Sequence, residues 1–149
     1  MKKILINFLY WGSKRSGIYR VGFDLIKEIL KLYSNNDYKF FCVTNYYNIK
    51  FENLEVIQRD FISDSKILKA IQSQFYLRKI IKDIKPDLIL NPFHFGYLFK
   101  LKIPQISVIY DLIPMTTFKK RIDTYLYHKF ILKTLINNCK YILTPSNAT

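Results

Sequence analysis

The residue of this sequence best placed to do chemistry is Asp111, which follows the apolar run Pro104–Tyr110 and begins the segment Asp-Leu-Ile-Pro. A run of this length and composition predicts a β-strand, and Pro114 ends it. Ligands of open parallel α/β sheets bind at the carboxyl ends of the strands, so we expect Asp111 to lie at a functional edge. Its carboxylate could accept hydrogen bonds from substrate hydroxyls, act as a base, or cap the following turn.

A second set of candidate residues lies in the loop 10–17, between the first apolar run and the first helical pattern. Ser16 and Gly17 stand at the expected helix N-terminus, where free N–H groups and the helix dipole attract anions. Arg20 adds positive charge one turn later. Gly12 and Gly17 are five residues apart, which is neither the GxGxxG nor the P-loop spacing. The loop is therefore either a phosphate site or an ordinary glycine-capped turn.

His94 is a third candidate, because it follows the fourth apolar run of the chain. An imidazole at the end of a strand can hydrogen-bond a polar substrate or move a proton near neutral pH, and between two phenylalanines it can equally be a packed structural residue. No Ser-His-Asp order and no cluster of metal ligands occurs in the sequence. We expect Cys42 and Cys139 to be buried free thiols.

Apolar runs and helical patterns alternate along the chain and define the elements that must position these residues. The expected strands cover 3–9, 38–44, 54–57, 87–91, 104–110 and 141–144. The expected helices cover 18–33, 67–84 and 122–135. This alternation predicts an α/β fold of one domain over residues 1–149, a Rossmann-like doubly wound parallel sheet in three α/β/α layers. Right-handed crossovers would bring the loops after the first, fourth and fifth strands to one edge.

The composition is strongly basic, with 24 Lys and Arg against 11 Asp and Glu and a net charge of +13. Such an excess favours anionic partners, whether nucleic acid, acidic lipid or phosphorylated ligands. The segment Lys66–Lys85 holds six cations with Phe75 between them, so this helix either lies on an anionic membrane surface or presents a solvated outer face. No helix-turn-helix, zinc or RNA-recognition signature is present, and we therefore expect no nucleic-acid partner.

The first residues, Met1–Trp11, combine a basic tip with a short apolar run, as a signal peptide does. No small-residue cleavage site follows, and a buried first strand explains the same residues. No apolar stretch approaches the ~20 residues that span a bilayer. We expect a cytoplasmic protein, peripheral at the inner face of the plasma membrane if its basic helices bind lipid.

In order and spacing, four segments resemble the N-terminal domain of GT-B glycosyltransferases of family 4, the group 1 transferases. These segments are Ser16–Val21, Pro86–Phe95, Ser107–Pro114 and Cys139–Asn147. They are similar to the family's Gly-Ile-Gly-Arg-Tyr opening, its fourth strand, its hxxHDLIP segment and its ADxIIxxS strand. Tyr19 stands where the family has its second glycine, and Tyr110 stands where it has a histidine before the aspartate.

The resemblance implies retaining transfer of a sugar from a nucleotide-sugar co-substrate to a glycan or lipid-linked acceptor, as in polysaccharide biosynthesis, with no metal or other cofactor. It assigns six residues to the donor phosphate (Ser16, Gly17), to catalysis (Tyr110, Asp111) and to the acceptor (Arg20, His94). The family's C-terminal domain and its E-x₇-E motif do not occur in the 149 residues. The resemblance thus implies an acceptor-side half, truncated or split, that is inactive without a separate C-terminal half.

A different interpretation explains the same features without catalysis. A non-catalytic Rossmann-like module that binds a phosphorylated ligand or a protein partner would have the same sheet, the same helix N-terminus and the same basic surface. Both interpretations place the binding site at the edge that holds Ser16, His94 and Asp111.

Overall fold

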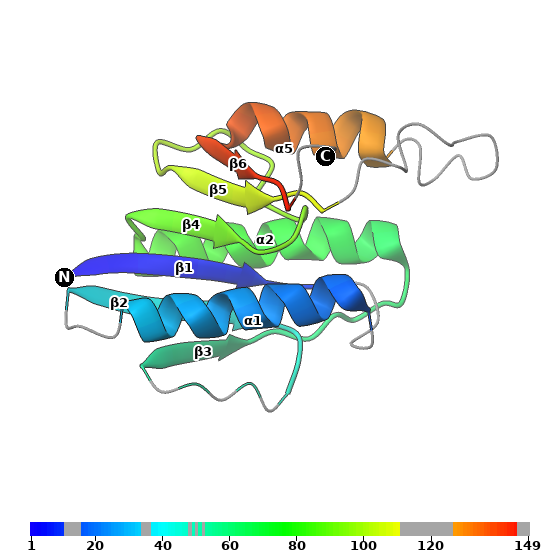
Figure 1. Cartoon of the computed structure of the whole chain (residues 1–149). Helices are drawn as coiled ribbons and strands as arrows, with labels where there is room; N and C mark the ends of the chain where they lie inside the picture. The colour runs from blue at the N-terminus through cyan, green and yellow to red at the C-terminus, as the bar shows by residue number, and fades with distance from the viewer. Residues whose placement is uncertain are drawn as a thin grey trace.

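The computed structural model describes residues 1–10, 16–33, 37–47, 49, 51, 53–110 and 127–145. These residues form a parallel sheet with strand order β3-β2-β1-β4-β5-β6 (Figure 1). The strands are β1 (Lys2–Phe8), β2 (Tyr38–Thr44), β3 (Leu54–Gln58), β4 (Leu88–Asn91), β5 (Gln105–Val108) and β6 (Tyr141–Leu143). The helices are α1 (Gly17–Leu32), α2 (Lys66–Ile84), the π-helical turn η1 (Tyr127–Leu132) and α5 (Lys133–Asn138). The predicted Rossmann-like α/β fold is confirmed.

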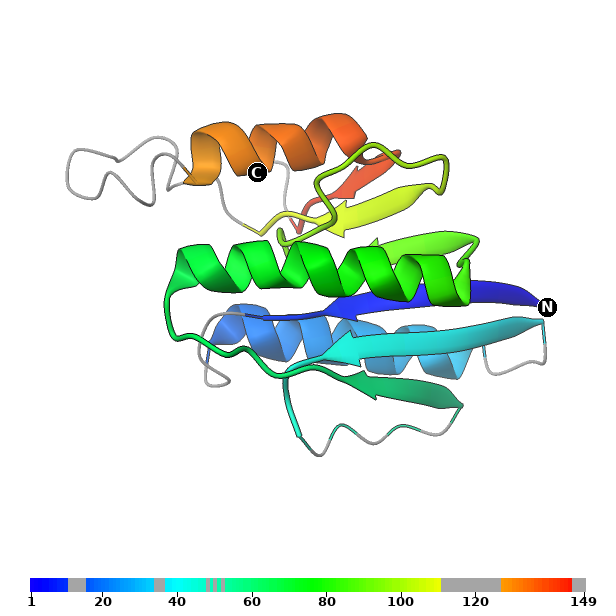
Figure 2. The ribbon, with the colours of Figure 1, turned by 180° about the vertical axis from the view of Figure 1, so that it is seen from behind.

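Helices cover both faces of the sheet, with α1 on one face and α2 on the other (Figures 1 and 2). Alternate residues of the central strand β1 pack into the two apolar cores, one on each face of the sheet. Ile4, Ile6 and Phe8 belong to the core beneath α1, and Leu5 and Leu9 belong to the core beneath α2. Because β1 is buried on both faces, it is a continuous apolar run rather than an alternating one.

The two long helices begin and end close to the predicted residues. Ser16 caps α1, and its hydroxyl accepts a hydrogen bond from the Tyr19 backbone N–H. Lys85 closes α2 in the left-handed conformation, with φ of 51°, and its N–H donates to the carbonyl of Ile81. A left-handed residue followed by proline is a common way to stop a helix. No helix among the described residues is long and apolar enough to cross a membrane.

The third predicted helix differs from the structure in its first described turns. Of the expected range 122–135, residues 122–126 lie outside the described residues, and η1 is π-helical before α5 continues to Asn138. The Thr134 hydroxyl donates to the carbonyl of Phe130 at 2.7 Å, four residues earlier. A side-chain donor at this carbonyl competes with the regular backbone ladder and accompanies the departure from α-helical geometry.

The connection between β4 and β5, residues 92–104, contains no helix, and its first residues, with Phe93 and Phe95, pack into the core beneath α1. Its residues Leu101 and Ile103 pack on the α2 core. Side chains from neighbouring elements hydrogen-bond its backbone at five residues: Phe93, Phe95, Gly96, Tyr97 and Leu98. These bonds give the connection the fixed path that a crossover helix would otherwise provide.

Candidate functional site

The strand order reverses direction between β1 and β4, so their carboxyl ends form the topological switch point where open α/β sheets bind ligands. Two fully buried amides join the strands there. Asn7 donates from Nδ2 to Asn91 Oδ1 at 3.0 Å, and the same amide nitrogen donates to the carbonyl of Phe95. The prediction that the loops after the first and fourth strands share one edge is therefore confirmed.

Aromatic rings fill the space between this edge and α1. Phe93, which is completely buried, packs at 4.8 Å from the Phe8 ring and 4.6 Å from the Tyr10 ring, measured between centroids. Gly22 of α1 makes room for it, because a Cβ built on Gly22 would lie 2.4 Å from Phe93 Cε1. A ligand at this edge must therefore bind above these rings and not directly on the strand ends.

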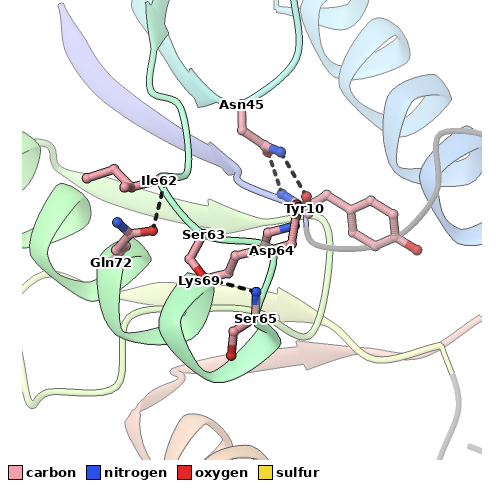
Figure 3. A network of polar contacts seen from close by, with 8 residues as sticks. All are labelled: Tyr10, Asn45, Ile62, Ser63, Asp64, Ser65, Lys69 and Gln72. Carbon is pink, nitrogen blue, oxygen red and sulfur yellow. Dashed lines mark hydrogen bonds and ion pairs between the residues drawn. The ribbon is translucent and has the colours of Figure 1, made fainter.

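Both ends of the first βα loop are anchored, although residues 11–15 lie outside the described residues. Asn45 holds the backbone of Tyr10 through two hydrogen bonds, of 2.9 and 3.0 Å (Figure 3). At the far end, the Tyr10 hydroxyl lies 2.8 Å from Ser16 Oγ. Gly17 is exposed, and a Cβ placed on it would meet no atom of the described residues within 4 Å. The two predicted phosphate residues thus lie at the N-terminus of α1.

Asn45 also distinguishes this site from a dinucleotide-binding site. Dinucleotide-binding domains place an acidic residue after their second strand to bind the ribose hydroxyls. Here the residue after β2 is Asn45, and both atoms of its amide group are bonded to Tyr10. This position therefore supplies no carboxylate for a ribose.

Tyr110 lies beyond the carboxyl end of β5 and packs against the core beneath α1. Its buried hydroxyl has no hydrogen-bond partner in the described part of the chain. Burial raises the pKa of Tyr110 to about 12, so the phenol is neutral at physiological pH and acts as a donor, not a base. A buried hydroxyl without a partner costs about 1–3 kcal/mol, which a ligand acceptor atom would recover.

The other predicted site residues are distributed around the same edge. His94 is half-buried after β4, and its ring lies 4.1 Å from the ring of Phe95. Arg20 is exposed on the first turn of α1. Asp111, the predicted catalytic carboxylate, falls outside the described residues. Within the described ranges, no group of three His, Cys, Asp or Glu side chains could hold a metal ion.

Sequence reasoning missed the amide side chains that fix the β4–β5 connection. Gln74 of α2 donates to the carbonyl of Gly96 at 3.0 Å and accepts from the Leu98 N–H at 2.9 Å. Gln105, at the start of β5, donates to the carbonyl of Tyr97 at 3.1 Å. The available signal was the presence of uncharged amides at positions expected to be buried, because a buried amide must find partners.

Two buried groups on the α1 side titrate only at high pH. Burial raises the pKa of the fully buried Cys42 thiol to about 12 from 9.0, and burial, with Tyr10 and Tyr19 nearby, raises the pKa of Tyr46 to about 12 from 10.0. Because the pKa of each group is higher in the folded state, the unfolded chain loses the proton of that group at a lower pH than the folded chain does. The contribution of these two groups to stability is therefore fully present below pH 9 and is lost as the pH rises toward 12.

We expect urea midpoints to fall steadily between pH 9 and pH 12 and the Cys42 thiol to resist alkylation until the chain unfolds. Urea titrations across this range, with thiol labelling in parallel, measure both effects. The Cys42→Ala variant removes one titrating group and should show a shallower pH dependence. A pH dependence as steep as that of the parent protein would contradict the assignment to Cys42.

Comparisons with known proteins give little beyond the fold. No family model matches the chain, and no curated protein matches it. A solved structure of a short chain dehydrogenase family protein from Francisella tularensis is similar, with 16% sequence identity and a TM-score of 0.46. The similarity covers 89% of this chain and 60% of that protein, so the chain spans less than two thirds of its length.

The predicted membership in glycosyltransferase family 4 is wrong. No family model and no curated protein matches the chain, so the comparisons lend this family no support. The segments behind the prediction are short, and apolar strands, a glycine at a helix start and a polar residue after a strand are common in Rossmann-like sheets of many functions. Five of the six candidate residues lie among the described residues, Asp111 lies outside them, and the sugar-transfer roles assigned to all six lose their basis.

Proposed function

We propose that the protein binds a small phosphorylated ligand at the carboxyl edge of its sheet, above the aromatic rings of the switch point. One observation carries this proposal. The Tyr110 hydroxyl is buried without a hydrogen-bond partner in the described residues, at the edge where Rossmann-like sheets bind their ligands. A ligand oxygen would complete the hydrogen bonding of this hydroxyl.

The N-terminus of α1 supplies the phosphate end of the proposed site. The first turn of α1 contains no acidic residue, and Gly17 and Arg20 are both exposed on this turn. Backbone N–H groups and the helix dipole attract an anion at such a place. The net charge of +13 adds long-range attraction for any phosphorylated ligand.

The neutral Tyr110 phenol selects for an acceptor oxygen on the ligand, such as a phosphate, hydroxyl or carbonyl oxygen. A ligand with both a phosphate and further oxygens would contact both parts of the proposed site. A nucleoside diphosphate and a nucleotide-sugar have this chemistry. The proposal concerns binding and assigns no reaction.

Ligand binding is tested by thermal unfolding and calorimetric titration with inorganic phosphate, uridine diphosphate and a uridine diphosphate sugar. At about 100 times the dissociation constant, a ligand that binds the folded state alone stabilises it by about 2.7 kcal/mol. That corresponds to a Tm increase of roughly 5–10 °C for a chain of this size. The absence of any shift with all three probes at millimolar concentration would overturn the proposal.

Two variants separate the phosphate part of the site from the hydroxyl part. We expect Gly17→Ala to keep its stability, because the new Cβ meets no atom of the described residues within 4 Å, and to bind phosphate probes at least about tenfold more weakly. We expect Tyr110→Phe to raise the stability of the free protein by about 1 kcal/mol, since it removes a buried unpaired hydroxyl. The same variant should weaken the binding of the nucleotide-sugar. Wild-type affinity in both variants would contradict the location of the site.

A further inference from the structure

The outward face of α2 carries large apolar side chains. Ile67 and Phe75 are 66% and 65% exposed, and Leu68 and Ile71 are each 48% exposed. The helix also has a normal buried face, which includes Leu77, Ile80 and Ile81. Residues three and four apart lie on one side of a helix, so Leu68, Ile71 and Phe75 form a continuous outer stripe.

Cations continue this stripe toward the C-terminal end of α2. Arg78, Lys79 and Lys82 are all exposed and lie on the same side as Phe75, at spacings of three, four and seven residues. The apolar part of the stripe occupies the N-terminal half of α2, and the basic part occupies the C-terminal half. We call the set of Ile62, Ile67, Leu68, Ile71, Phe75, Arg78, Lys79 and Lys82 the α2 surface.

Ile62 extends the apolar part beyond the start of the helix. It is 89% exposed, and its backbone N–H donates to Gln72 Oε1 at 3.3 Å (Figure 3). The ion pair between Asp64 and Lys69, at 3.5 Å, ties the same loop to α2. Because α2 itself holds the loop, Ile62 is presented in a fixed position beside the helix.

The other crossover helix shows what an ordinary outer face looks like in this protein. The exposed residues of α1 are of mixed charge, with Glu28 and Lys31 forming an ion pair at 2.6 Å. Val21 and Leu32 are the exposed large apolar residues of this helix, at 49% and 76%, and charged residues separate them along it. An exposed apolar stripe is therefore a property of α2 and not a general consequence of the fold.

We infer that the α2 surface binds the headgroup region of an anionic lipid bilayer. Apolar side chains on one half of a surface helix enter the boundary between headgroups and acyl chains, and cations beside them pair with anionic headgroups. The positive net charge of the chain, +13, complements an anionic bilayer and opposes the approach of a second copy of the protein. The lipid surface is the occupant that matches both halves of the α2 surface.

Vesicle cosedimentation tests this inference with the whole protein. We expect binding to phosphatidylcholine vesicles that contain about one third phosphatidylglycerol, weaker binding to phosphatidylcholine alone, and loss of binding as salt rises to about 1 M. The Lys79→Gln/Lys82→Gln variant should bind on the order of 20-fold more weakly. The Phe75→Ser variant should bind roughly tenfold more weakly.

Matched variants on α1 provide the controls. Lys27→Gln/Lys31→Gln makes the same change in net charge on the opposite face of the sheet, and Val21→Ser makes a similar exposed apolar change. Both should bind vesicles within about twofold of the parent protein. An equal loss in the α1 and α2 variants would overturn the inference, because overall charge would then explain the binding. Self-association that Phe75→Ser abolishes, without vesicle binding by the parent protein, would overturn it in favour of a second copy.

Discussion

Gly22→Ala is expected to destabilise the protein by about 2 kcal/mol, although alanine is ordinarily better than glycine inside a helix by about 1 kcal/mol. The new methyl group would lie 2.4 Å from Phe93 Cε1 and 2.8 Å from Phe93 Cζ. The ring cannot move aside cheaply, because Phe8 and Tyr10 pack against it. Chemical unfolding at equilibrium measures the change.

A double-mutant cycle with Phe93→Leu shows whether the clash is the cause. Leucine leaves space near Gly22, so we expect Gly22→Ala to become neutral or stabilising in the Phe93→Leu background. The same cost in both backgrounds would contradict the proposed contact between α1 and the switch point. The cycle also tests the site, because this contact sets the distance between α1 and the carboxyl edge.

Asn91→Leu is expected to destabilise the protein by about 2–4 kcal/mol, even though leucine has the same branched side-chain skeleton and the position is fully buried. The substitution removes the acceptor of the Asn7 amide, at 3.0 Å, and the donor to the carbonyl of Ile106, at 3.3 Å. The carbonyl of Ile106 would lose a buried donor, and a missing partner inside a core is costly. Urea unfolding midpoints with a constant m-value would measure the loss.

The pair Asn7→Leu and Asn91→Leu tests whether the two amides act as a unit. Each single variant breaks their mutual hydrogen bond, so the double variant should cost clearly less than the sum of the two single variants. Strict additivity would indicate that the bond between the β1 and β4 amides contributes little. In that case the junction of the two strands would depend on backbone pairing and apolar packing alone.

Local sequence features predicted most of the elements and their boundaries. The apolar runs of β1 and β2 are buried on both faces, and the helical spacing that begins near Gly17 and Lys66 gave α1 and α2 within one or two residues. The sequence predicts Ser16 at the start of α1, and its hydroxyl caps the helix as the residue type suggests. These features depend on neighbours within a few residues, which a sequence displays directly.

The sequence predicted which edge of the sheet holds the candidate residues, but it did not predict the contacts that these residues make. The edge that holds Ser16, Gly17 and His94 was expected from the rule for parallel sheets, and the pairing of β1 with β4 brings the ends of their strands together. The family was predicted wrongly because short motifs describe the strand ends of any such sheet. The chemical role of a residue depends on partners far away in the chain, and short motifs do not contain them.

The alternation of strands and helices, the free thiols and the basic charge follow from residue types and local spacing. Contacts in the folded chain place Phe93 in the space beside Gly22, bond Asn45 to Tyr10 and bury the Tyr110 hydroxyl without a partner among the described residues. The same contacts leave several apolar residues of α2 outside the core. The physical reason is that burial and hydrogen-bond pairing are properties of contacts between distant segments, and those contacts exist only once the chain has folded.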